Sequence, residues 1–163
     1  MVPMPDDAHY IAGIFLDERS VISRSPQVEH ERKVAIYDLL EANHFKPKGD
    51  IEGPYNLHLS IEDNRLAFDV RDLHDQALIR FTLALSPFRS IIREYFMVCD
   101  SYFKAIKSAS PSQIEAIDMG RRGLHNDGAE LLRERLQGKV ELDPNTARRL
   151  YTLICVMHVR VRD

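Results

Sequence analysis

The chain has 163 residues, a length that suits one well-packed domain and is short for two. Hydrophobic residues make up 44% of it and charged residues 29%, a composition that excludes a disordered chain. The formal net charge of −3 argues against nucleic-acid binding, because a protein that binds phosphate backbones needs a basic surface. No segment approaches the roughly 20 apolar residues of a membrane helix, and the first residues lack a signal core. We therefore expect a cytoplasmic protein without a membrane partner.

The chain begins with a predicted flexible tail, residues 1–9. A single domain is predicted over residues 10–163. Residues 10–16 (YIAGIFL) form a predicted strand that is apolar on both faces. Ser25 and Pro26 then provide a capping side chain and a first-turn proline, so a helix is expected from there to about Asn43. A loop follows.

Three strands are predicted next, because apolar and polar residues alternate over 55–61, 65–71 and 77–85. Asp63 and Asn64 tolerate positive φ and suit a tight turn between the first two strands. Short connections make the three strands antiparallel neighbours, and we expect helix 87–107 to cover one face of their sheet.

Three more helices are predicted, each started by a capping residue and a proline: Ser86-Pro87, Ser110-Pro111 and Asp143-Pro144. The first presents a broad aromatic face, the second ends near Gln137, and the third is apolar nearly all round, which indicates a central position. The predicted fold class is α+β, with an antiparallel three- to four-stranded meander sheet packed against about four helices and the C-terminal helix central.

The two cysteines, Cys99 and Cys155, lie among apolar residues in predicted helices and are interpreted as buried free thiols. Cys155 and His158 share a helical face and can supply two metal ligands. A zinc site needs three or four ligands, and the sequence has no second pair with ligand spacing. Neither a metal nor a cofactor is therefore expected.

Residues 111–128 are the most informative stretch, because they place charged side chains on the apolar stripe of a predicted helix. Arg121 falls near the centre of the stripe, with Asp118 and His125 just beside it. Asp118 can pair with Arg121 or Arg122 one turn later, which leaves guanidinium donors free, and His125 can titrate near neutrality. These residues are candidate ligands for a phosphate or carboxylate. We expect Arg121 to be more than half buried, with an acid or an anion at hydrogen-bond distance.

Alternatives stay open for this stretch. Arg121 can form a purely structural ion pair with an acid from another element, with His125 a satisfied hydrogen bonder. Gly120, Gly123 and Gly128 can break the helix, since a glycine inside a helix costs about 1 kcal/mol relative to alanine, or they can let a neighbour approach closely.

Arg32 is a further candidate residue for binding the anionic ligand, because it lies on the apolar stripe of the first helix. Glu29, His30 and Glu31 stand beside it. Glu29 and His30 can act as an acid–base pair, whereas a structural bridge between Arg32 and an acid is the plainer interpretation.

Several segments of the chain resemble, in this order, a small family of bacterial proteins. It is number two-six-two in the UPF (uncharacterised protein family) series. The strings that carry the resemblance are EHER (29–32), GPYNLHL (53–59), SPFRSIIREYFMVCDSYF (86–103), SPSQIEAIDMGRRGLHNDGAELL (110–132) and DPNTARRLYTLICVMH (143–158). The family has no established activity, so the resemblance implies a single cytoplasmic bacterial domain and transfers no catalytic role.

Two functions are compatible with these patterns. The leading hypothesis is a non-enzymatic interaction or regulatory domain with a protein partner or a second copy of itself, since no catalytic signature is present and helix 87–107 has aromatic residues on more than one face. The alternative is a small-molecule or enzymatic site for an anionic ligand around the helix at 111–137, with help from Arg32 or Asn126. A concave pocket on which the candidate side chains converge would favour the alternative.

Overall fold

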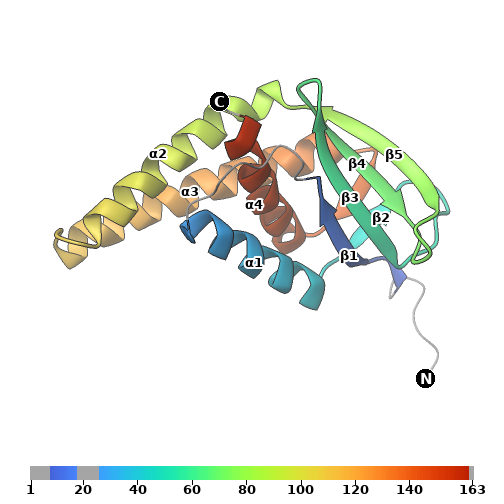
Figure 1. The fold of residues 1–163 in the computed structure, drawn as a ribbon, viewed down its shortest axis with the longest axis horizontal. Helices are drawn as coiled ribbons and strands as arrows, with labels where there is room; N and C mark the ends of the chain where they lie inside the picture. The colour runs from blue at the N-terminus through green and yellow to red at the C-terminus, as the bar shows by residue number, and fades with distance from the viewer. Residues whose placement is uncertain (1–7, 18–25, 162–163) are drawn as a thin grey trace.

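A computed structural model describes residues 8–17 and 26–161, with the backbone alone for Gln27 and residues 158–161. The strands and helices follow one another as β1 (Ile11–Leu16), α1 (Pro26–Glu41), β2 (Phe45–Pro47), β3 (Tyr55–Glu62), β4 (Arg65–Arg71), β5 (Ala77–Ala84), a 3₁₀ turn (Ser86–Phe88), α2 (Arg89–Ala105), α3 (Pro111–Leu136), β6 (Val140–Leu142) and α4 (Pro144–Val161). Figure 1 shows the main sheet at one end of the molecule and the helices extending from it, which confirms the α+β class.

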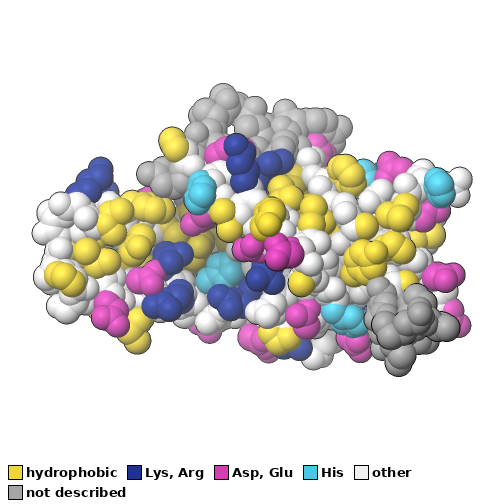
Figure 2. Space-filling view, turned by 90° about the horizontal axis from the view of Figure 1, so that it is seen from below, with side chains coloured by type: hydrophobic (Ala, Val, Ile, Leu, Met, Phe, Trp, Pro, Cys, Tyr) yellow, Lys and Arg dark blue, Asp and Glu magenta, His cyan; other side chains and the backbone are white. Residues whose placement is uncertain are grey.

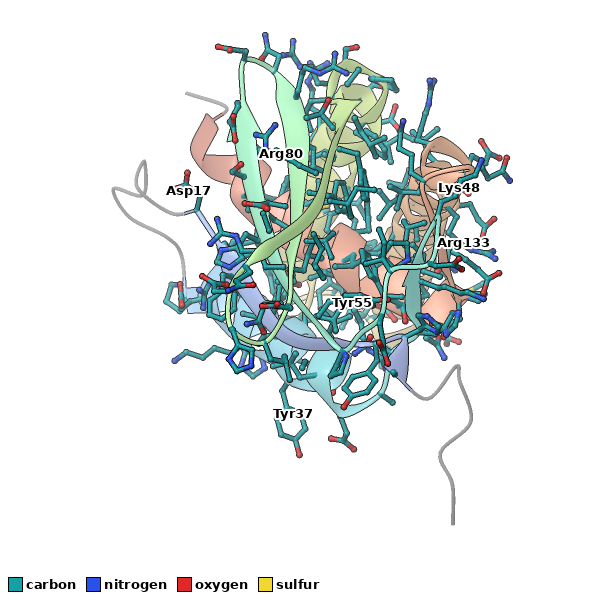
Figure 3. The ribbon with its side chains drawn as sticks, turned by 90° about the vertical axis from the view of Figure 1, so that its right-hand side faces the viewer. Asp17, Tyr37, Lys48, Tyr55, Arg80 and Arg133 are labelled. Atoms are coloured by element: carbon teal, nitrogen blue, oxygen red, sulfur yellow. The ribbon has the colours of Figure 1, made fainter. Side chains whose placement is uncertain are left out.

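The main sheet has the strand order β1-β3-β4-β5. β3, β4 and β5 form the predicted antiparallel meander, and β1 adds a parallel strand at the edge beside β3. Asp63 and Asn64 make the tight turn with φ values of 51° and 61°. The alternating apolar residues face inward: Leu83 is buried, and Phe81 is half-buried with its ring 5.0 Å from that of Phe68. Charged side chains such as Arg80 and Asp17 lie on the outer side of the sheet (Figure 3).

The C-terminal helix α4 is central, as predicted. It packs against both α1 and α3, and its residues 153–157 are all buried. The expectation that helix 87–107 covers the sheet is wrong, because α2 pairs with α3 and runs away from the sheet alongside it (Figure 1). The aromatic face of α2 packs on helices instead: the ring of Tyr95 lies 5.4 Å from that of His125 in α3.

Among the described helix starts, the predicted cap by a side chain is confirmed at Ser110. The hydroxyl of Ser110 accepts from the backbone N–H of Gln113, whose side chain accepts from the Ser110 N–H, so α3 begins with a capping box. The carboxylate of Asp143 accepts from the hydroxyl of Thr146 at the start of α4. Ser86 does not cap a helix, because the chain makes a 3₁₀ turn there before α2 begins. The cap predicted at Ser25 lies outside the described residues.

The small sheet of β2 and β6 was not predicted. These three-residue strands pair antiparallel, Phe45 with Leu142 and Pro47 with Val140, and are too short to show an alternating pattern. β2 lies within the loop that was predicted after the first helix, and β6 follows the end of α3. The carbonyl of His9 accepts from the N–H of Phe45, so His9 joins the fold although the predicted tail extends to residue 9. Across the described residues, no helix is long and apolar enough to cross a membrane.

Cys99 and Cys155 are free and buried, as predicted. Burial raises the pKa of the Cys99 thiol to about 11 and raises that of Cys155 as well, so little reactive thiolate forms near neutrality. We expect both thiols to resist a thiol reagent such as dithiodipyridine in the native protein and to react promptly in denaturant. The absorbance of the released product measures the reaction. Rapid labelling of both thiols without denaturant would contradict the structure.

Candidate functional site

A polar cleft with a volume of about 410 Å³ lies between α1, α3 and α4, with Tyr95 of α2 in its wall. On one side of the molecule, Lys and Arg side chains gather around a histidine, with acidic side chains close by (Figure 2). The cleft contains three of the four residues predicted on α3. The charged and titratable side chains from α1 and α3 are His30, Glu31, Asp38, Arg121, Arg122 and His125.

The charge of Arg121 is compensated within α3, which continues through Gly120 and Gly123 without a break. Its Nε donates to a carboxylate oxygen of Asp118 at 3.0 Å, and Arg122 lies 3.0 Å from the other oxygen. The side chains of Arg121 and Asp118 are 26% and 22% exposed, so the expected burial of Arg121 beside an acid is confirmed. The hydrogen bond from Arg121 holds the pKa of Asp118 below its usual range. One carboxylate therefore balances two guanidinium groups, and one positive charge is left over.

The imidazole of His125 is held in one orientation. Its ring lies between those of Tyr95 and Tyr151, with centroids 5.4 Å and 5.2 Å away. Its Nε2 lies 2.7 Å from the hydroxyl oxygen of Thr152. We assign the proton of the neutral ring to Nε2, because the Thr152 hydroxyl then accepts from Nε2–H while it donates to the carbonyl of Arg148 at 3.1 Å. Nδ1 then carries the lone pair of a neutral ring.

Electrostatics keep this ring neutral. Burial, together with the charges of Arg148 and Arg121, lowers the pKa of His125 to about 4. The sequence-based expectation that His125 titrates near neutrality is therefore wrong, because it considered the nearby charges without the burial between two aromatic rings. At neutral pH His125 is a hydrogen-bond acceptor through Nδ1 and adds no charge to the cleft.

The basic side of the cleft comes from α4. Four polar residues of α4 line it at helical spacing, which puts them on one face of the helix: Asn145, Arg148, Arg149 and Thr152. Among the described residues, no acidic side chain lies within 4 Å of Arg148 or Arg149. The sequence-based prediction did not include this stripe. The spacing of the two arginines relative to Asn145 and Thr152 was the signal that could have found it.

The acidic side of the cleft comes from α1. Glu31 and Asp38 line it against the four arginines of α3 and α4, so positive charge is in excess. Burial raises the pKa of Glu31, although the charges of Arg121 and His30 act in the opposite direction. Charged groups in such a partly buried cleft interact more strongly than on an open surface.

Arg32 and Asn126 do not line this cleft. A guanidinium nitrogen of Arg32 lies 3.9 Å from the carboxylate of Glu29 one turn earlier, in agreement with the structural interpretation of Arg32. Glu29 therefore faces Arg32, while His30 lines the cleft, so these two residues do not form an acid–base pair there. The side chain of His158, the other residue considered as a metal ligand, lies outside the described residues.

A second groove of about 460 Å³ lies between the C-terminal half of α3 and the small sheet. Figure 3 shows Lys48 and Arg133, two of its lining residues, on the same side of the molecule. Its three basic side chains are matched by three acidic ones, and Arg133 pairs with Glu130 at 3.1 Å. This groove has no excess of either charge, so the cleft between α1, α3 and α4 is the better candidate for a charged ligand.

The fold and cleft define an α+β protein with a basic cleft among its helices. Its chain belongs to the uncharacterised protein family UPF0262, whose profile matches residues 8–160. It is 59% identical to a UPF0262 protein of Paramagnetospirillum magneticum over 150 residues, which are 92% of this chain and 96% of that protein. It is 58% identical to one from Rhodospirillum rubrum over 154 residues, which are 94% and 95% of the two chains. No solved structure matches the chain.

Proposed function

We propose that the protein binds a small anionic ligand, bearing phosphate or carboxylate, in the cleft between α1, α3 and α4. The observation that carries the proposal is the pair Arg148 and Arg149, which has no acid partner in the described part of the chain and lines the same cleft as Arg121 and Arg122. Unpaired guanidinium groups keep their N–H donors available for the oxygen atoms of an anion.

The surroundings of these arginines add to this support. A guanidinium group presents a planar fork that donates two hydrogen bonds to a phosphate or carboxylate. Asn145 lies in the first turn of α4, where the helix dipole also favours negative charge.

We expect the double variant Arg148→Gln/Arg149→Gln to bind phosphate and malate about tenfold or more weakly than the parent, because each lost charge-assisted hydrogen bond is worth about 1.5–3 kcal/mol. Titration calorimetry at low ionic strength measures both affinities. The control is Arg93→Gln/Arg135→Gln, which changes the net charge equally at exposed helix positions that do not line the cleft. Equal weakening in both double variants, or no binding by the parent, would contradict the proposal.

An interaction with another protein chain is the second candidate function. The outer side of α1 leaves Tyr37 and Leu40 exposed by 69% and 39%, and Figure 3 shows Tyr37 pointing away from the body of the molecule. A stable contact between two copies would bury about 1,000 Å² or more. The expectation of a cytoplasmic protein also stays a proposal, with the two free thiols in its favour.

A further inference from the structure

Two hydrogen-bond acceptors that line the cleft are unused. With Nε2–H assigned as the donor to Thr152, Nδ1 of His125 presents a lone pair, and no described residue donates to it. Nδ1 is also absent from the fully buried polar atoms that lack a partner, so it remains accessible. Glu31 likewise makes no hydrogen bond or ion pair within the described residues. Acceptors of this kind are satisfied only by a hydrogen-bond donor.

The same cleft offers unused donors. Arg148 and Arg149 have guanidinium N–H groups without acid partners in the described ranges, and they require an acceptor-rich group. A ligand that carries only acceptors would satisfy these arginines but would place its lone pairs against Nδ1 of His125 and the carboxylate of Glu31. Both contacts would be repulsive, and both acceptors would stay unpaired.

We infer that the ligand is an anion that carries its own O–H donor, such as hydrogen phosphate or a hydroxycarboxylate, and that Glu31 and Nδ1 of His125 select it over acceptor-only anions. This inference rests on the proposed function of the cleft. The negatively charged oxygen atoms of the ligand accept from Arg148 and Arg149, and the hydroxyl group of the ligand donates toward the opposite side of the cleft. Burial raises the pKa of Glu31 against the nearby charges of Arg121 and His30, consistent with a carboxyl group that forms no hydrogen bond within the described residues.

Two pairs of anions separate the effect of an O–H donor on binding from the effect of charge. Hydrogen phosphate and sulfate are tetrahedral dianions of similar size near pH 8, and only hydrogen phosphate has an O–H group. Malate and succinate differ in the same way among dicarboxylates. We expect the parent protein to prefer the hydroxyl-bearing member of at least one pair by about 10- to 100-fold in Kd, measured by titration calorimetry. The pair that shows the preference identifies the ligand as a phosphate or a carboxylate.

The variant Glu31→Gln tests the assigned role directly, because the amide keeps the shape of the side chain and supplies an N–H donor in place of an acceptor. We expect it to bind sulfate or succinate more tightly than the parent, so that the preference falls to threefold or less. Glu94→Gln, at an exposed position of α2 outside the cleft, should keep the preference of the parent.

The outcomes distinguish the two proposals. Equal binding of both members of each pair by the parent overturns the O–H selection and leaves anion binding in place. An unchanged preference in a folded Glu31→Gln variant overturns the role of Glu31. Failure of the parent to bind any of the four anions overturns the proposed function itself, and the selection with it.

Discussion

Replacing Gly128 with alanine is expected to destabilise the protein by about 1–3 kcal/mol, the usual range for overpacking a tight core. A Cβ at this position would overlap with Cζ and the hydroxyl oxygen of Tyr151. Tyr151 is fully buried in the central helix α4, so its ring has no open space to move into. This clash outweighs the gain of about 1 kcal/mol in helix propensity that alanine brings.

Two other glycines of α3 provide matched controls. Gly120 and Gly123 are exposed, and a Cβ at either position would meet nothing within 4 Å. Gly120→Ala and Gly123→Ala are therefore expected to stabilise the protein by about 0.5–1 kcal/mol each. Urea unfolding measures all three variants. A Gly128→Ala variant as stable as the parent would show that α3 and α4 do not pack as closely as described.

The same substitution links packing to the site. The ring of Tyr151 lies 5.2 Å from that of His125, so a displaced Tyr151 shifts a wall of the cleft. A smaller side chain at position 151 should remove the clash. We expect Gly128→Ala to destabilise less in a Tyr151→Leu background than in the parent, which a double-mutant cycle measures as a coupling energy.

Acidification is expected to remove roughly 3 kcal/mol of stability through His125 alone. The folded protein holds the pKa of this imidazole at about 4, whereas in the unfolded chain it lies near 6.5. Above about pH 6.5 neither state is protonated at this position, and the full stability is present. Between about pH 6.5 and 4 the unfolded chain binds a proton that the folded protein does not, so the free energy of unfolding falls as the pH falls. Below about pH 4 the loss is complete.

His125 is one of several titratable groups that contribute to the pH dependence of stability. The charged or titratable groups around His125 come from three other helices and from its own: Tyr95, Glu31, His30, Arg148, Tyr151 and Arg121. Glu31 acts in the opposite direction, because its raised pKa lets the folded protein retain a proton that the unfolded chain releases as the pH rises. The wild-type pH dependence is therefore a sum over these groups.

We expect His125→Gln to lose about 3 kcal/mol less than the parent between pH 7 and pH 4, in urea unfolding at a series of pH values. His74→Gln, at an exposed turn outside the cleft, is the control for removing one histidine. Parallel stability curves for His125→Gln and the parent would show that His125 is not held neutral by its surroundings.

About half of the candidate site could be predicted from the sequence. Asp118, Arg121, Arg122 and His125 were identified because charged residues on the apolar stripe of one helix are visible in the order of residues. Asp118 proved to compensate the arginines beside the cleft, while the other three line it. Arg148, Arg149 and Glu31 were not assigned to the site. Which charged residue of a helix faces a cleft depends on the neighbouring helices.

The local structure could be predicted from the order of residues: the meander strands from their alternation, the turn from Asp63 and Asn64, which tolerate positive φ, and α3 from its cap and stripe. These features depend on residues a few positions apart, whose interactions any short segment already contains. The pairing of β2 with β6, the path of α2 along α3 and the cleft become visible in the folded molecule alone. Each of these joins segments far apart in the chain, because burying the apolar face of one element requires a partner whose distance in sequence no local pattern records.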